Sequence, residues 1–155
     1  ALEALHAQQQ LHAARSFQCV YRGEAFQPVS MDAELVTLAL SNLLDNAAKY
    51  AFEDSPIRLE VDVDEQSASV RYRVINEDPG LPPELAGRAF QMFQRIMGTG
   101  SEKGGFGIGL ALAAHVATIH GGQLTSAQDG TQTCFTLDIP IRQSGSASKR
   151  IQDEA

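Results

Sequence analysis

The most informative segment of the chain reads Asn42-Leu43-Leu44-Asp45-Asn46-Ala47-Ala48-Lys49-Tyr50. In a helix, residues three, four and seven positions apart share a face, so Asn42, Asn46, Lys49 and Tyr50 project together. The apolar stripe on the other side consists of Leu40, Leu43, Leu44 and Ala47. An amide that faces a core costs about 1–3 kcal/mol unless it is hydrogen-bonded, so the polar face favours a ligand site. Taken alone, it is equally compatible with an amphipathic helix whose amides are capped or solvated.

This polar face suits a nucleotide with its magnesium ion. Magnesium prefers oxygen ligands and usually takes only one or two from protein, while water and substrate phosphates supply the rest. An asparagine carbonyl offers one oxygen without adding charge. Lys49 could reach a phosphate as a point charge, and Tyr50 could lie against a base.

A glycine cluster further along the chain opens a second helix. It reads Gly104-Gly105-Phe106-Gly107-Ile108-Gly109-Leu110. Glycines before a helix let the backbone approach a phosphate, which the unpaired N–H groups and the positive helix end attract. The spacing fits neither a Walker loop, because no Gly-Lys-Ser/Thr follows, nor a dinucleotide fingerprint. On its own the cluster is also compatible with a flexible loop.

Composition limits the classes of protein that the chain can belong to. With 155 residues and 43% apolar content, it can build one domain with a core. The formal charge of −7 argues against a nucleic-acid partner. Cys19 and Cys134 lack neighbouring Cys or His at metal-ligand spacing, which favours free thiols in a reducing compartment. The chain begins with Ala, which suggests a piece of a longer protein.

Hydrophobic periodicity and turn residues predict the order of elements. We expect helices over 2–14, from an N-cap at Ser30 or Asp32 to about Tyr50, from residue 82, and over 108–120. We expect strands over 17–22, 57–63, 69–76, 123–127 and 133–139, with 96–107 as a long glycine-rich loop. The fold class is α+β, a two-layer sandwich in which a mixed, mainly antiparallel sheet packs on three helices. A cleft should lie between the asparagine helix and the loop.

Together these segments resemble the catalytic and ATP-binding domain of bacterial sensor histidine kinases, in the superfamily that includes gyrase and the heat-shock-90 chaperones. The resemblance covers roughly residues 25–141. Asn42 to Tyr50 is similar to the N box, Gly80-Leu81-Pro82 to the end of the G1 box, Phe90 to Arg95 to the F box, and Gly105 to Leu110 to the G2 box, closed by His120-Gly121-Gly122.

The resemblance implies a role for each matching residue. Asn42, Asn46 and Lys49 would be catalytic, with Asn46 the magnesium ligand, Asn42 supporting the phosphates and Lys49 contacting phosphate. Residues 96–105 would form a lid, and Tyr50 would pack at the adenine. The implied nucleotide-binding set is Asn42, Asn46, Lys49, Tyr50, Asn76, Asp78, Gly80, Lys103, Gly105, Gly107, Gly109 and Leu110. The cofactors would be ATP and Mg²⁺.

The resemblance also bears on reaction type and partners. The superfamily's hydrolases have a glutamate base where this chain has Asn42, and an amide cannot take a proton from water, so phosphoryl transfer fits better than hydrolysis. The acceptor would be a histidine on the dimerisation domain of the same protein, with onward transfer to a response regulator receiver domain. Within the chain, His6 and His12 lack the acceptor motif and fit surface histidines, and His120 fits a structural role.

The resemblance further implies the setting of the domain. Residues 1–15 would end a preceding dimerisation helix or linker, 16–141 would be the ATP-binding domain and 142–155 a disordered tail. The full-length protein would be a membrane-anchored dimer, with this domain in the cytoplasmic part of an inner-membrane sensor.

The G1 box departs from the family pattern, Asp-x-Gly-x-Gly followed by Ile or Leu and Pro. Aligning on Gly80 puts Asn76 at the aspartate that accepts a hydrogen bond from adenine, and Asp78 at the first glycine. Asp78 could supply the missing carboxylate from a shifted position, or it could block the pocket. Three functions remain open: a working ATP-binding domain with a modified adenine pocket, a degenerate domain that acts by protein docking, and a domain with another nucleotide or activity, such as an anti-sigma-type serine kinase.

Overall fold

A computed structural model describes residues 1–23, 31–64, 67–79 and 108–141. Five strands form one sheet in the order β1-β2-β3-β5-β4. Strand β1 (Phe17–Arg22) is parallel to β2 (Ile57–Asp64), and the other neighbours are antiparallel: β2 with β3 (Ser69–Glu77), β3 with β5 (Gln132–Pro140), and β5 with β4 (Gln123–Asp129). The predicted mixed, mainly antiparallel sheet is therefore confirmed.

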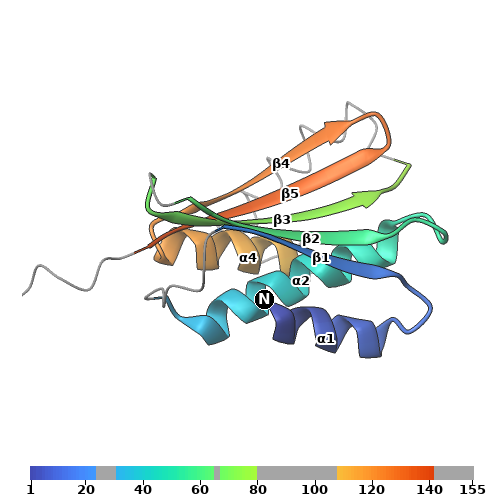
Figure 1. The fold of residues 1–155 in the computed structure, drawn as a ribbon, viewed down its shortest axis with the longest axis horizontal. Helices are drawn as coiled ribbons and strands as arrows, with labels where there is room; N and C mark the ends of the chain where they lie inside the picture. The colour runs from blue at the N-terminus through green and yellow to red at the C-terminus, as the bar shows by residue number, and fades with distance from the viewer. Residues whose placement is uncertain (24–30, 65–66, 80–107, 142–155) are drawn as a thin grey trace, which may run out of the picture.

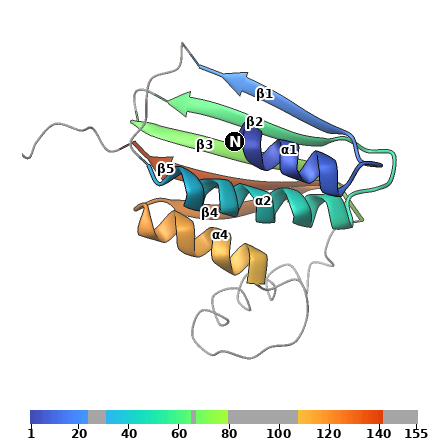
Figure 2. The ribbon, with the colours of Figure 1, turned by 90° about the horizontal axis from the view of Figure 1, so that it is seen from below.

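Three helices of the described chain lie on one side of this sheet (Figure 1). They are α1 (Leu2–Leu11), α2 (Ala33–Tyr50) and α4 (Ile108–Ile119). Seen from below, α2 lies between α1 and α4 (Figure 2). This arrangement confirms the two-layer α+β fold. The predicted helix from residue 82, the loop 96–107 and the tail 142–155 lie outside the described residues.

The core lies between the two layers because helix α2 buries one complete stripe. Leu40, Leu43, Leu44 and Ala47, the residues of the predicted stripe, are all buried. They pack in one cluster with the side chains that β2, β3 and β5 direct at the helices, such as Leu59, Val74 and Leu137. Helix α1 joins this core through Ala4 and Leu5, whereas the assignment of residues 1–15 to a preceding element stays a prediction.

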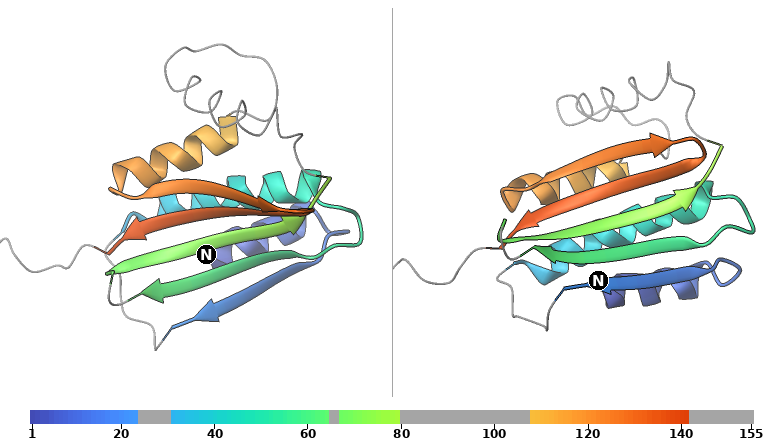
Figure 3. Two further views of the ribbon diagram at one scale, coloured as in Figure 1. Left: turned by 90° about the horizontal axis from the view of Figure 1, so that it is seen from above. Right: turned by 45° about the horizontal axis from the view of Figure 1, so that its top comes forward.

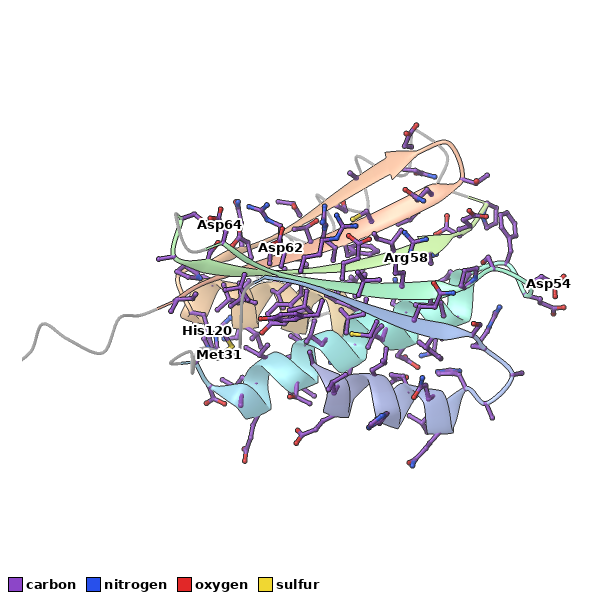
Figure 4. All side chains as sticks on the ribbon, viewed as in Figure 1. Met31, Asp54, Arg58, Asp62, Asp64 and His120 are labelled. Carbon is purple, nitrogen blue, oxygen red and sulfur yellow. The ribbon has the colours of Figure 1, made fainter. Side chains whose placement is uncertain are left out.

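The opposite face of the sheet carries charged side chains, and none of the described helices covers it. Figure 4 shows Arg58, Asp62 and Asp64 on the side away from the helices. Glu60, also on this face, is buried beneath arginines and forms an ion pair with Arg73 at 3.0 Å. Alternation along β2 therefore separates an apolar inner side from a charged outer side.

The His120-Gly121-Gly122 segment fixes the end of α4 against the rest of the domain. His120 Nδ1 is 2.8 Å from the carbonyl oxygen of Val116, and the backbone N–H of Asp32 donates to His120 Nε2 at 3.2 Å. Gly121 has φ +76°, which suits a glycine that ends a helix. A Cβ on Gly122 would lie 1.9 Å from the backbone oxygen of Asp138. These contacts of His120 join the end of α4 to the residue before α2, in agreement with the predicted structural role. Figure 4 labels His120 at the end of the domain where α2 begins.

Candidate nucleotide-binding site

The contact between α2 and the first turn of α4 brings the asparagine motif to the glycine motif. A Cβ added to Gly109 would lie 2.8 Å from Asn42 Oδ1, so the amide of Asn42 fills the space that a side chain would take. The Asn42 Nδ2 group donates to the carbonyl oxygen of Leu38 at 2.8 Å, which holds the amide in place. Two motifs that are distant in the sequence therefore meet through these two residues.

Asn46 and Tyr50 continue the same face of α2 beyond Asn42. Both side chains are half-buried. One helical turn separates Asn42 from Asn46, so their amides lie on the same side of α2 as Gly109. In the part of the chain that the structure describes, no hydrogen bond is found for the Asn46 side chain. The position agrees with the expected magnesium ligand, although the role itself stays a prediction.

Lys49 contacts Asp45, and Asp45 in turn contacts helix α1. Lys49 Nζ lies 2.6 Å from Asp45 Oδ2, and His12 Nε2 lies 2.9 Å from Asp45 Oδ1. Burial raises the pKa of Asp45, but hydrogen bonds from Lys49 and His12 outweigh it and hold that pKa below its ordinary value. The hydrogen bond with Asp45 raises the pKa of Lys49. Both effects favour the charged forms of Asp45 and Lys49 at the last turn of α2.

The Lys49–Asp45 contact does not prevent Lys49 from meeting a phosphate. Both side chains are partly exposed, and pairs of this kind contribute only about 0.2–1 kcal/mol. A phosphate carries more charge than one carboxylate and can share the ammonium group. The role of Lys49 as a phosphate contact stays a prediction.

Asn76 and Asp78 form a polar network at the end of β3. Asn76 is 2% exposed, and its Nδ2 group donates to Asp78 Oδ2 at 2.9 Å. The hydroxyl of Thr133 donates to Asp78 Oδ1 at 3.1 Å, and the backbone N–H of Asp78 donates to the carbonyl oxygen of Thr131 at 2.9 Å. The two residues that depart from the G1 pattern therefore contact each other.

This network and the asparagine face lie at the same end of the domain. The backbone N–H of Phe52, just after α2, donates to the carbonyl oxygen of Glu77 at 2.8 Å, which ties the end of α2 to the end of β3. The first turn of α4 lies at this end as well (Figures 2 and 3). Leu110 in that turn packs against the core. The predicted site residues Gly80, Lys103, Gly105 and Gly107 lie outside the described residues.

The described residues fit a nucleotide better than a metal centre built by protein alone. Within the described ranges, no group of three or more His, Cys, Asp or Glu side chains could hold a metal ion. The close approach of Asn42 to Gly109 and the neutral amides of α2 suit a magnesium site in which phosphates supply most of the oxygen ligands of the ion. Among the described helices, none combines the length and the hydrophobicity that a transmembrane helix requires.

Comparison with known proteins shows the family to which this domain belongs. Residues 31–143 match the family described as "Histidine kinase-, DNA gyrase B-, and HSP90-like ATPase", so the chain belongs to this family of ATPases. Family membership implies that the domain binds ATP.

Sensor kinases are among the curated proteins that the chain resembles. It is 30% identical to the sensor histidine kinase WalK of Bacillus subtilis (strain 168) over 117 residues, which are 74% of this chain and 19% of WalK. It is 33% identical to the adaptive-response sensory kinase SasA of Parasynechococcus marenigrum (strain WH8102) over 116 residues, which are 74% of this chain and 30% of SasA. The chain thus spans less than a third of the length of these relatives.

Solved structures with the same fold include two from histidine kinases. A nucleotide-free catalytic domain of the histidine kinase ThkA has a TM-score of 0.69 at 22% identity, covering 90% of each chain. The mycobacterial sensor histidine kinase MprB has a TM-score of 0.68 at 22% identity, covering 90% of this chain and 91% of that one. These likenesses support the fold.

Two contacts near the site did not follow from the sequence. We expected His12 to be a surface histidine; its side chain is 23% exposed, and its hydrogen bond with Asp45 is a contact that the sequence did not predict. Thr133 was not considered at all, yet it holds Asp78. The spacing of four residues between Asp45 and Lys49 predicts their own ion pair, but it gives no signal for the contact of Asp45 with His12. The signal for Thr133 was the pairing of its strand with β3, which places it opposite Asn76.

Proposed function

We propose that this chain is the ATP-binding catalytic domain of a sensor histidine kinase, which donates the γ-phosphoryl group of ATP to a histidine on a separate dimerisation domain. The observation that carries the proposal is the contact of Asn42 with Gly109, which joins the asparagine helix to the glycine turn. A response regulator would receive the phosphoryl group afterwards. The chain would be the cytoplasmic part of a dimeric inner-membrane sensor.

The residues of the site suit positioning and charge neutralisation. Asn46 would offer its amide oxygen to Mg²⁺, and Lys49 would place its positive charge beside a phosphate. Bound ATP with Mg²⁺ supplies the phosphoryl group and the counter-charge for its transfer. Asn42 carries an amide, which cannot take a proton from water, so at this position the chain would orient the nucleotide and not activate water.

The test is a transfer assay with ATP labelled at the γ-phosphate. The chain is incubated with labelled ATP and Mg²⁺, alone and with the histidine-bearing domain of its longer protein supplied separately. We expect label on the added domain only, in an acid-labile and base-stable form. Asn46→Ala should abolish this transfer, whereas Gln18→Ala, an exposed amide change on the edge strand β1, should leave it unchanged. Rapid release of free phosphate by the chain alone would contradict the proposal.

A further inference from the structure

The Asn76–Asp78 network decides which end of the Asn76 amide is available to a ligand. An asparagine amide has a donor end and an acceptor end of similar size, so its orientation is set by its hydrogen-bond partners. A carboxylate is only an acceptor, and Nδ2 of Asn76 donates to that of Asp78 at 2.9 Å. Within the described ranges, no hydrogen bond reaches Oδ1 of Asn76. The acceptor end is therefore the end that remains for a ligand.

Asp78 is itself held beside Asn76 by two hydrogen bonds. Thr133 lies opposite Asn76 on the neighbouring strand β5 and donates to the second carboxylate oxygen at 3.1 Å. The backbone N–H of Asp78 is bound to Thr131 on the same side. Turning the Asn76 amide over would place its oxygen against a carboxylate oxygen and lose a charge-assisted hydrogen bond. The orientation of the Asn76 amide therefore depends on contacts between the end of β3 and β5.

Purine bases differ at the group that such an amide would meet. Adenine carries an amino donor at position 6, whereas guanine carries an oxo acceptor there. An amide oxygen pairs with the first and repels the second. On the basis of the proposed function, we propose that Asp78 is a specificity-determining residue, because it fixes Asn76 with its oxygen toward the base and so selects 6-aminopurine over 6-oxopurine nucleotides.

The proposal accounts for both departures from the G1 pattern together. An asparagine at position 76 alone would be free to serve either purine by turning its amide over. A carboxylate at position 78 removes that freedom and restores the acceptor that an aspartate at position 76 would supply. Asp78 acts here through Asn76, so it is a positioning residue, and the readout must be base preference and not affinity alone.

The experiment is a comparison of ATP and GTP dissociation constants by calorimetry with Mg²⁺. The unaltered chain should prefer ATP by about tenfold or more, the ratio expected when a buried acceptor meets the wrong base edge. Asp78→Asn is nearly isosteric and can accept or donate, so the Asn76 amide can turn over and the ratio should fall toward one. The double variant Asn76→Asp/Asp78→Asn reverses the network with the same composition and should keep the ATP preference.

Each outcome decides the matter, provided that denaturant unfolding shows the variants to be folded. Equal weakening of ATP and GTP by Asp78→Asn would show a purely structural role and overturn the inference. Equal affinities in the unaltered chain would overturn it too, while the proposed function would stand. No ATP binding would overturn both. If Asp78→Asn does not fold, Thr133→Val loosens Asp78 from β5 and should lower the ratio in the same direction, and an unchanged ratio would contradict the inference.

Discussion

Replacing Gly109 with alanine should weaken nucleotide binding while leaving the domain folded. The new Cβ would lie 2.8 Å from Asn42 Oδ1, a contact that real Cβ atoms essentially never make. The opposing atom is the end of a side chain, so Asn42 can rotate away. That rotation breaks the hydrogen bond from Asn42 to the Leu38 carbonyl, a loss of about 0.5–1.5 kcal/mol.

The change also has a favourable effect on the helix itself. Alanine in place of a helical glycine contributes up to about 1 kcal/mol, less in a first turn. The two effects nearly cancel, so the free energy of unfolding should change by less than about 1 kcal/mol. ATP affinity has no such compensation. Displacing the Asn42 amide should lower it by about fivefold or more, equivalent to about 1 kcal/mol.

The assay combines calorimetric titration of ATP with urea unfolding of the same samples. The matched control is Gly109→Ala in an Asn42→Ala background, where the clash is gone and the change should stabilise the helix with no further loss of affinity. If Gly109→Ala instead stabilised the otherwise unaltered chain by the full helix-propensity gain and left ATP affinity unchanged, Asn42 would not fill that space.

Three further predictions concern stability. Gly122→Ala should destabilise the domain by about 3 kcal/mol or more, because its Cβ would meet the backbone of Asp138. The Cβ of Gly121→Ala would face open space, so this variant should cost only about 1–2 kcal/mol for its positive φ. A larger loss of unfolding free energy in Gly121→Ala than in Gly122→Ala, measured by chemical denaturation, would contradict this prediction. Because the pKa of Asp45 is lowered, the ionised side chain stabilises the fold above pH 3.8, and this stabilisation is lost as the pH falls below that value. The unaltered chain should therefore have a larger unfolding free energy than Asp45→Asn at neutral pH but not in acid. A difference between the two that does not change with pH would count against the contacts of Asp45. Burial, with a smaller effect of Tyr21, raises the pKa of Tyr72 to about 12, so as the pH rises this tyrosine loses its proton first in the unfolded chain. The free energy of unfolding should therefore fall by about 2–3 kcal/mol between pH 10 and 12. In urea titrations at alkaline pH, Tyr72→Phe should remove this loss.

Much of the fold could be predicted because its elements carry strong local signals. Strict alternation in 57–63 and 69–76 predicted β2 and β3, and the structure extends each by one residue. The buried stripe of α2 followed from helical spacing, and Asp32, one of two candidate N-caps, accepts the N–H of Leu35. The end of α1 was predicted three residues too late, since Ala-rich sequence has no stop signal and His12 turns away to reach Asp45.

The site was harder to predict because its geometry depends on tertiary contacts. The sequence places Asn42 and Asn46 on one face of a helix. It explains Gly109 by the approach of a phosphate, but it does not show that the absence of a side chain at Gly109 also leaves room for the amide of Asn42. It also left open whether Asp78 supplies a carboxylate or blocks the pocket. The hydrogen bonds from Asn76 and Thr133 show that the carboxylate is held at the end of β3 beside Asn76, which depends on the pairing of β3 with β5.

Whether the domain binds ATP through a magnesium ion held by Asn46 can be measured by calorimetric titration of ATP with and without Mg²⁺, repeated with Asn46→Ala. We expect ATP binding that Mg²⁺ strengthens in the unaltered chain, and binding that is weaker and insensitive to Mg²⁺ in the variant. A folded chain that shows no ATP binding would rule out the proposed nucleotide site, and an Asn46→Ala variant that keeps the full Mg²⁺ effect would rule out Asn46 as the magnesium ligand.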